Sequence, residues 1–218
     1  MSTDRTPPLR SHSDNICPWW LCPIFDNPLR RLFQNPSRIL AGLVQPGEIA
    51  LDLGCGMGYF SIPLARLVGP QGKVICVDLQ EQMLAGVRRR AERAGVPDRI
   101  RLHQAGTDGL GLAETADFAL AFWMLHEVPD QAAFLAEVRA CLRPGGRLLI
   151  AEPRIHVGRA AFERSVEIAA SNGWKPGGRR AIALSRAVVL STRTESREKP
   201  VFDTFQTRNS TCVAKTSL

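Results

Sequence analysis

Short apolar runs alternate with helical segments along the middle of this chain, and this alternation constrains its fold more than any other feature. Apolar runs of strand length occur at residues 48–53, 73–78, 99–104, 116–122 and 146–152. Between them, residues 58–68, 81–94 and 131–142 have the apolar spacing of helices, and Asp130 and the sequence RPGG bound the last of these. Strands that alternate with helices predict a parallel sheet covered on both faces, and therefore a doubly wound α/β fold.

The flanking segments predict further elements. Asn27-Pro28 and Asn35-Pro36 each look like an N-cap followed by proline at the first helical position, which predicts two short helices at about 28–34 and 36–44. Downstream, residues 159–172 have a helical pattern. Residues 179–191 read as two strands around a tight turn, so we expect a mostly parallel seven-stranded sheet whose last strand is antiparallel.

Three regions follow from this reading. Residues 1–45 are expected to form a lid with leading helices, and residues 46–191 the ligand-binding domain. The remaining residues, 192–218, are rich in serine and threonine and keep no hydrophobic period, so we expect a disordered tail.

Composition narrows the cellular setting. No apolar run approaches the roughly 20 residues that span a bilayer, and the polar N-terminus lacks the apolar core of a secretory signal. The six cysteines show no framework spacing, so we expect a cytoplasmic, reduced protein without membrane contact. The net charge of +7 gathers at the C-terminal end, where residues 153–218 carry 12 basic and 5 acidic side chains. This excess is diluted, and we favour a solvated surface over a nucleic-acid partner.

The loop after the first predicted strand carries the strongest motif, ALDLGCGMGYF at residues 50–60. Its pattern is D-x-G-x-G-x-G, starting at Asp52. The dinucleotide fingerprint G-x-G-x-x-G would need a third glycine where Tyr59 stands, and the Walker loop needs a lysine that does not occur before Lys73. Both phosphate-binding interpretations therefore fail on spacing, and the acid before the glycines favours a ligand that carries positive charge.

In its motifs the chain resembles the class I S-adenosylmethionine-dependent methyltransferases. LDLGCGMGYFS resembles their first motif, and Asp78 at the end of VICVD matches the second. ADFALAFWMLHEVPD and LRPGGRLLIAEP resemble the later motifs of the branch that includes quinone-biosynthesis C-methyltransferases. The resemblance covers roughly residues 36–190 and implies a Rossmann-like methyltransferase fold with S-adenosylmethionine as cofactor.

The resemblance implies a set of cofactor contacts. Backbone N–H groups of the glycine loop would take the carboxylate of S-adenosylmethionine, Asp52 would favour its cationic end, and Asp78 would accept hydrogen bonds from the ribose hydroxyls. The alternative for Asp78 is a helix N-cap. The expected cofactor-binding residues are Asp52, Gly54, Cys55, Gly56, Gly58, Tyr59, Asp78, Leu79, Gly106, Thr107 and Phe122.

The adenine site departs from the family pattern. The family often has an acid after the third strand, whereas Gly106 and Thr107 stand at that position here, with Asp108 one residue beyond. Adenine is then held by Thr107, by Asp108 after a shift, or mainly by backbone and packing against Leu79.

Three polar residues near the expected methyl end are candidates for acceptor chemistry. His126 and Glu127 follow the fourth predicted strand, and Glu152 ends the fifth. Each has a general-base or acceptor-orienting role and a structural alternative in a turn or loop. HEVPD is not H-E-x-x-H, and we expect no metal site.

The stretch CPWWLCP at residues 17–23 has two interpretations. Trp19 and Trp20 serve either as part of a lid over the site or as buried anchors. Arsenite methyltransferases share this core and bind substrate through thiolates, so Cys17 and Cys22 could join Cys55 in a metalloid site, although free cysteine is commonly a small buried hydrophobe.

The sequence thus predicts an enzyme that transfers a methyl group from S-adenosylmethionine to a small-molecule acceptor. One alternative is an RNA or protein methyltransferase that docks through the basic C-terminal third. The other is a non-catalytic subunit that binds S-adenosylmethionine. The acceptor atom and the oligomeric state are not predicted.

Overall fold

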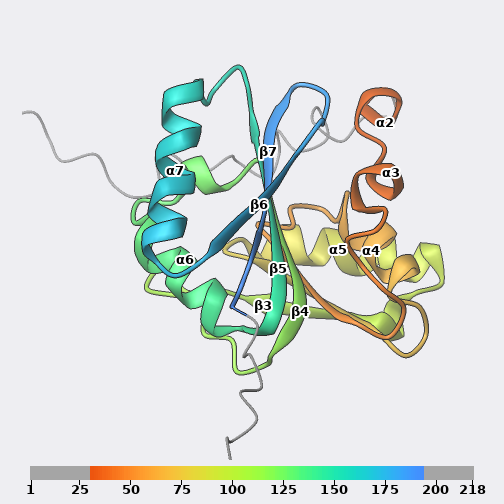
Figure 1. The fold of residues 1–218 in the computed structure, drawn as a ribbon. Helices are drawn as coiled ribbons and strands as arrows, with labels where there is room; N and C mark the ends of the chain where they lie inside the picture. The colour runs from red at the N-terminus through yellow and green to blue at the C-terminus, as the bar shows by residue number, and fades with distance from the viewer. Residues whose placement is uncertain (1–29, 194–218) are drawn as a thin grey trace, which may run out of the picture.

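A single seven-stranded sheet with helices on both faces makes up the part of the chain that the computed structural model describes, residues 30–193 (Figure 1). The strands are β1 (Ile49–Leu53), β2 (Lys73–Asp78), β3 (Ile100–Gln104), β4 (Ala116–Phe122), β5 (Leu142–Pro153), β6 (Lys175–Arg180) and β7 (Ser185–Ser191). The helices are α2 (Arg30–Phe33), α3 (Pro36–Leu40), α4 (Ser61–Leu67), α5 (Glu81–Ala94), α6 (Gln131–Ala140) and α7 (Arg159–Ser171), with single 3-10 turns η3 (Pro97–Arg99) and η4 (Leu125–Glu127).

The strand order is β3-β2-β1-β4-β5-β7-β6. Strands β1 to β5 pair in parallel, whereas β7 is antiparallel to both of its neighbours, β5 and β6. The expected doubly wound, mostly parallel sheet with an antiparallel last strand is confirmed. The order reverses between β1 and β4, which places a topological switch point in the middle of the sheet.

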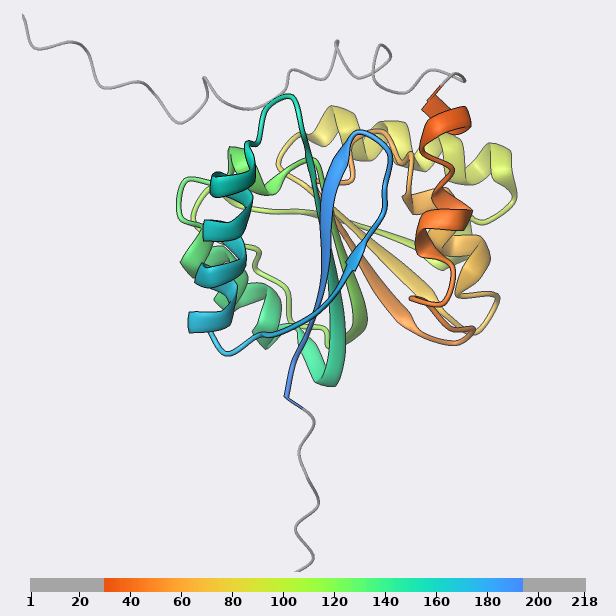
Figure 2. The ribbon, with the colours of Figure 1, turned by 45° about the horizontal axis from the view of Figure 1, so that its top comes forward.

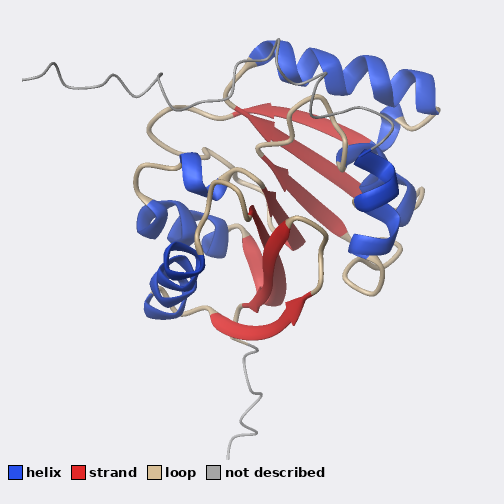
Figure 3. Ribbon diagram, turned by 90° about the horizontal axis from the view of Figure 1, so that it is seen from above, coloured by secondary structure: helices blue, strands red, loops and turns tan. Residues whose placement is uncertain are grey.

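Two apolar layers cover the sheet (Figures 2 and 3). Helices α3, α4 and α5 supply the core on one face, where Leu64 and Val87 are fully buried. Helices α6 and α7 supply the other, with Leu135 and Phe162. Because both faces are covered, the middle of β2 is a continuous apolar run, buried from Val74 to Val77.

Local signals in the sequence explain most helix boundaries. Gly95 ends α5 in the left-handed conformation, with φ of 69°, and its N–H bonds to Ala91 and Glu92 carbonyls. Asp130 caps α6 by accepting from the N–H of Ala133. Asn35 caps α3 in the same way, from the N–H groups of Ser37 and Arg38.

Five predicted boundaries were wrong by more than one residue. Helix α4 begins at Ser61 because the glycines before it form a turn, and α3 ends at Leu40 rather than at residue 44. Helix α6 ends at Ala140, and the RPGG sequence that follows belongs to β5, where it pairs irregularly with the start of β4. Strand β6 begins at Lys175, before the predicted residue 179, and its Pro176–Arg179 stretch is shifted in register against β7.

Several sequence expectations lie outside the described residues. These are the start of the first leading helix, the Trp19, Trp20, Cys17 and Cys22 side chains, and the tail from residue 194. They remain predictions. Between residues 30 and 193, no helix is long and apolar enough to cross a bilayer.

Candidate functional site

The glycine loop leaves β1 at the switch point of the sheet. Gly54, Gly56 and Gly58 have φ values of 62°, 52° and 90°, a region that side chains other than glycine rarely adopt. A Cβ at Gly54 would lie 2.9 Å from the Cβ of Met124, in the loop after β4. The loop therefore winds tightly across the end of β1 and presents backbone rather than side chains at the carboxyl edge of the sheet.

Asp78 joins the end of β2 to this loop. Its Oδ2 accepts from the N–H of Gly56 at 3.0 Å, and its Oδ1 accepts from the N–H of Gln80 at 3.0 Å. Burial raises the pKa of Asp78, and these backbone hydrogen bonds oppose that rise. Gln80, the residue at the N-cap of α5, has no side-chain cap, so Asp78 holds the loop after β2 rather than the first turn of the helix.

Asp52 lies beneath the loop, near the end of β1. It is 3% exposed, and the hydroxyl of Ser61 donates to its Oδ2 at 2.6 Å. Burial raises the pKa of Asp52 to about 7, with the Ser61 hydrogen bond acting against this and the charge of Asp78 adding to it. Sequence reasoning predicted Asp52 but missed Ser61, whose only signal was its place at the start of α4.

Cys55 turns away from the carboxyl edge into the apolar layer. It is buried, its N–H donates to the Val77 carbonyl, and its thiol donates to the Gly56 carbonyl at 3.6 Å. The neighbouring Cys76 thiol, together with burial, raises the pKa of Cys55 well above its usual value, which leaves an unreactive thiol. Of the predicted metalloid site, only Cys55 is described, and residues 30–193 contain no cluster of three metal-ligating side chains.

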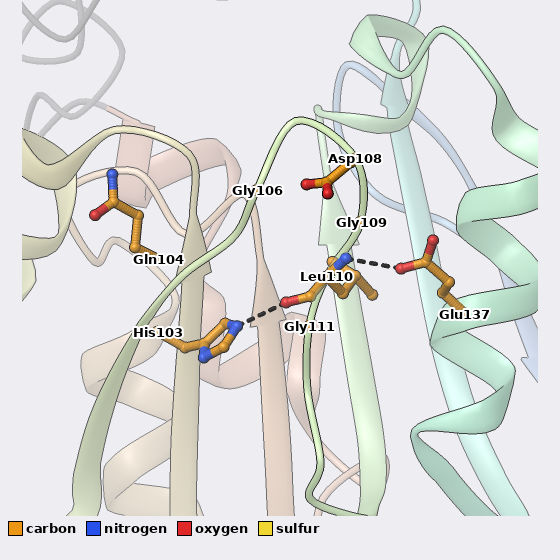
Figure 4. Close-up of a pocket in the computed structure, with 8 residues that line it drawn as sticks. All are labelled: His103, Gln104, Gly106, Asp108, Gly109, Leu110, Gly111 and Glu137. Atoms are coloured by element: carbon orange, nitrogen blue, oxygen red, sulfur yellow. Dashed lines mark hydrogen bonds between the residues drawn. The ribbon is translucent and has the colours of Figure 1, made fainter.

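A polar cavity of about 460 Å³ opens beside the loop after β3 (Figure 4). Its lining consists of His103, Gln104, Gly106, Asp108, Gly109, Leu110, Gly111 and Glu137. His103 Nε2 lies 2.6 Å from the Leu110 carbonyl, and the Leu110 N–H donates to Glu137 Oε2 at 2.7 Å. Of the three residues considered for adenine, Gly106 and Asp108 line this cavity, whereas exposed Thr107 does not.

The ends of β2 and β3 meet next to this cavity. Gln104 Nε2 donates to the Leu79 carbonyl at 3.1 Å. Leu79 is 38% exposed, an apolar face large enough for a planar ring to pack on. Sequence reasoning missed His103 and Glu137, which lie on β3 and α6 and carry no motif of their own.

His126 and Glu152 come together from neighbouring strand ends. His126 Nδ1 lies 2.5 Å from Glu152 Oε2, and the other carboxylate oxygen of Glu152 accepts from the N–H of Leu125 at 3.0 Å. Glu152 is 2% exposed. The hydrogen bond that His126 Nδ1–H donates to Glu152 raises the pKa of His126, with the charges of Glu152 and Glu127 in support and burial in opposition. Glu127 thus acts on this pair through its charge.

A second imidazole accompanies the pair. The ring of His156, in the loop after β5, lies parallel to that of His126, with 6.0 Å between centroids and 5° between planes. Sequence reasoning did not single out His156. Phe122 ends β4 on the other side of this region, where its ring lies 4.3 Å from that of Phe60, and Tyr59 donates its hydroxyl to the Gln34 carbonyl at 2.7 Å.

The arrangement fits the cofactor that the motifs imply. Tight backbone at the glycine loop offers N–H donors, Asp78 retains acceptor capacity beside it, and Leu79 provides an apolar face. The His126–Glu152 pair lies beyond β4 and can exchange a proton with a bound molecule.

Known proteins resemble this chain in its motif-bearing region. Residues 50–146 match a family model described as a methyltransferase domain. Over 110 residues the chain is 41% identical to an uncharacterised protein of a transposon from Streptomyces fradiae, a match that covers 50% of this chain and 31% of that protein. Over 110 residues it is 36% identical to the ubiquinone/menaquinone biosynthesis C-methyltransferase UbiE of Pasteurella multocida, covering 50% of this chain and 41% of that protein. The matches thus span less than half the length of these two relatives.

A solved structure resembles the whole described fold. A SAM dependent methyltransferase from Aquifex aeolicus superimposes with a TM-score of 0.72 at 22% identity, covering 81% of this chain and 98% of that one. This similarity identifies the fold.

Proposed function

We propose that this chain transfers a methyl group from S-adenosylmethionine to a small-molecule acceptor, as a class I S-adenosylmethionine-dependent methyltransferase; the match of its motif region to a methyltransferase domain and the likeness of its fold support this. One observation carries the proposal. The glycine loop and Asp78 are joined by a hydrogen bond at the switch point. The His126–Glu152 pair lies at the ends of β4 and β5, the next two strands after β1 in the sheet, at the same edge. The cofactor and proton-transfer groups therefore face one region.

Five groups of this chain would hold the cofactor. Asp78, already fixed by two backbone N–H groups, accepts the ribose hydroxyls, and the N–H groups of the glycine loop take the carboxylate. Leu79 packs against adenine, and Gly106 and Asp108 border its edge. When bound, S-adenosylmethionine supplies a methyl group activated by the sulfonium charge.

The His126–Glu152 pair is the proposed proton acceptor. Glu152 engages Nδ1, so Nε2 is the atom that takes a proton from the acceptor molecule. Glu152 is itself fixed by the Leu125 N–H, which makes it a positioning residue for the imidazole. Since the pKa of His126 is raised, the imidazole becomes a competent base only above its usual titration range.

The basic C-terminal third supports a small acceptor over a nucleic acid. Within its described part, several arginines already bind their own chain. Arg179 pairs with Glu163, and the guanidinium groups of Arg154, Arg180 and Arg186 donate to the carbonyls of Ser185, Ala41 and Val157. Guanidinium groups used in this way are less available for phosphates. The relative named for quinone C-methylation makes quinol-type rings the first acceptors to test.

The proposal also places the protein in the cytoplasm. The described cysteines, Cys55, Cys76 and Cys141, are all free thiols, which suits a reducing compartment.

Methyl transfer from labelled S-adenosylmethionine to a panel of quinols, phenols, amines and thiols tests this function. We expect label in one chemical class of the panel, and loss of that transfer in Asp78→Ala. Binding to mixed RNA at two salt concentrations runs in parallel, because phosphate contacts weaken steeply with salt. Methylated RNA without any methylated small molecule would contradict the proposal, and cofactor binding without turnover of any acceptor would favour a non-catalytic subunit.

A further inference from the structure

Four aromatic rings surround the guanidinium of Arg30, the first described residue of α2. The guanidinium carbon lies 4.3 Å from the ring centroid of Tyr59 and 4.6 Å from that of Trp123. Phe122 and Phe60 are at 5.5 Å and 6.0 Å. All four distances are within the range in which an aromatic face attracts a cation. We call these four rings the aromatic cage.

The aromatic cage is held by contacts of its own. Tyr59 donates its hydroxyl to the Gln34 carbonyl, and the indole N–H of Trp123 donates to the Ser185 hydroxyl at 2.9 Å. The rings also contact one another in sequence, with centroid distances of 5.2 Å, 4.3 Å and 5.5 Å from Tyr59 through Phe60 and Phe122 to Trp123. The cage is therefore linked both to the segment that carries Arg30, through Gln34, and to β7, through Ser185.

Its position is beside the cofactor loop. Tyr59 directly follows Gly58, and Phe122 ends β4, the strand that pairs with β1 at the switch point. Trp123 has a φ of 61°, a conformation that is costly for an aromatic residue and is found where surroundings over-determine the backbone. Asp78 approaches the same loop from the β2 side, so the loop has an acidic side and an aromatic side.

We propose that the aromatic cage is the seat of the cofactor's sulfonium, and that Arg30 occupies this seat as an internal cation that competes with it. This inference rests on the proposed function. Asp78 contacts the glycine loop from β2, and the cage lies where β4 ends on the other side of β1. A ligand with its ribose at Asp78 and its chain across the loop would reach the cage with its cationic end. Two positive charges repel one another in a space of this size, so the cage holds Arg30 or the sulfonium, but not both.

This competition distinguishes the cofactor from its product. Methyl transfer converts the sulfonium into a neutral thioether, which gains no cation–π attraction and does not repel a guanidinium. Arg30 then returns to the cage, and α2, which carries it, returns to the position seen here. Arg30 thus weakens binding of S-adenosylmethionine selectively and leaves binding of S-adenosylhomocysteine unaffected.

Calorimetric titration of the full chain with each of the two ligands tests the inference. Arg30→Met keeps a flexible, unbranched side chain, though a shorter one, and removes its charge. We expect it to bind S-adenosylmethionine about tenfold more tightly, equivalent to about 1.4 kcal/mol, with no gain for S-adenosylhomocysteine. Arg30→Lys retains a cation and should stay close to the wild type.

The rings provide the matched comparison. Tyr59→Leu removes one face of the cage and should weaken S-adenosylmethionine more than S-adenosylhomocysteine, whereas Tyr59→Phe keeps the ring and should preserve the wild-type ratio of the two affinities. Trp fluorescence should also change with S-adenosylmethionine more than with S-adenosylhomocysteine, and Trp123→Phe should abolish the difference.

Two outcomes distinguish a failure of the sulfonium seat from a failure of the proposed function. If Arg30→Met changes both affinities by the same factor, or neither, Arg30 is a structural contact and the sulfonium seat is wrong while the proposed function stands. If the folded wild-type protein binds neither ligand, the proposed function fails and the inference fails with it.

Discussion

At the scale of single residues, Asp52 combines two properties that oppose each other. It is a buried carboxyl group that accepts a hydrogen bond from the Ser61 hydroxyl, and its pKa is raised from 3.8 to about 7. Each unit of difference between folded and unfolded pKa corresponds to about 1.4 kcal/mol. The ionised form of Asp52 is thus destabilising, a cost that suits a group placed for a cationic ligand rather than for stability.

Replacing Asp52 with asparagine should therefore change the pH dependence of stability. The folded protein binds this proton more tightly than the unfolded chain, so the free energy of unfolding falls as pH rises from about 4 to about 7. Asp52→Asn removes that fall. In urea unfolding, the difference in the free energy of unfolding between the variant and the wild type should therefore favour the variant more at pH 8 than at pH 4. Exposed Asp98→Asn is the control. Parallel wild-type and Asp52→Asn profiles would show that Asp52 is not protonated in the fold.

The His126–Glu152 pair predicts a pH dependence of catalysis. Once an acceptor is known, kcat/KM should rise with pH through an apparent pKa above 6.5, because the imidazole must lose its proton first. Glu152→Gln should move this apparent pKa down, and Glu127→Gln should move it less, since the charge of Glu127 is the smallest of the effects that raise the pKa of His126. A lower rate in Glu152→Gln without a shift of the profile would reduce Glu152 to a structural role.

The sequence predicted these residues one at a time, but not their pairings. Asp52, Asp78 and the three glycines could be found because one continuous motif and one strand end carry them. His126 and Glu152 are 26 residues apart and meet only through the β4–β5 register, in which Phe122 faces Ala151. Arg30 has no motif, so its place among the aromatic rings could come only from the fold.

At the scale of elements, a buried glutamine links the short α2–α3 segment to the turn between β6 and β7. Gln34 is 1% exposed, and its Nε2 donates to the Ala183 carbonyl at 2.8 Å and to the Ser185 hydroxyl at 3.3 Å. Its Oε1 accepts from Arg30, and its carbonyl accepts from Tyr59. This residue ties the leading helices to the β6–β7 turn and to the aromatic cage.

Gln34→Ala should accordingly cost about 1–3 kcal/mol of stability, since it leaves the Ala183 carbonyl and the Arg30 guanidinium without this partner. Denaturant titration measures the loss. Exposed Gln45→Ala serves as the control, because the hydrogen bonds between Gln45 and Glu48 use the backbone N–H and carbonyl of Gln45, which the substitution retains. Equal stability of the two variants would mean that α2 and α3 are held by other contacts.

Element order could be predicted from the sequence more reliably than element ends. Alternating apolar runs specify the sheet because each run must be buried on both faces. The starts of β5 and β6 were missed because Pro144, Gly145, Pro176 and Gly177 argue against strands. In the fold, irregular pairing with β4 and β7 accommodates them.

At the scale of the whole molecule, Thr192, the last but one of the described residues, links the end of β7 to the start of β5. Thr192 follows β7, its N–H donates to the Gly146 carbonyl at 2.9 Å, and its hydroxyl donates to the Arg143 carbonyl at 2.8 Å. Thr192 thereby fixes the irregular start of β5.

Two truncations locate the boundary of the domain. Ending the chain after Arg193 should leave the melting temperature nearly unchanged, because the residues beyond it have few apolar side chains. Ending it after Ser191 removes both Thr192 bonds and should cost about 1–3 kcal/mol. A large loss of stability in the chain that ends after Arg193 would place residues after 193 in the fold.

The central claim is that the glycine loop and Asp78 form an S-adenosylmethionine site, and calorimetry on the purified chain tests it most directly. Wild type should bind S-adenosylmethionine and S-adenosylhomocysteine, but not NAD or ATP. Asp78→Ala should weaken both ligands by about 1.5–3 kcal/mol for each ribose hydrogen bond lost, while Glu81→Gln, an exposed carboxylate three residues away, should bind as wild type does. Absence of binding by the wild type, or wild-type affinity in Asp78→Ala, would contradict the account.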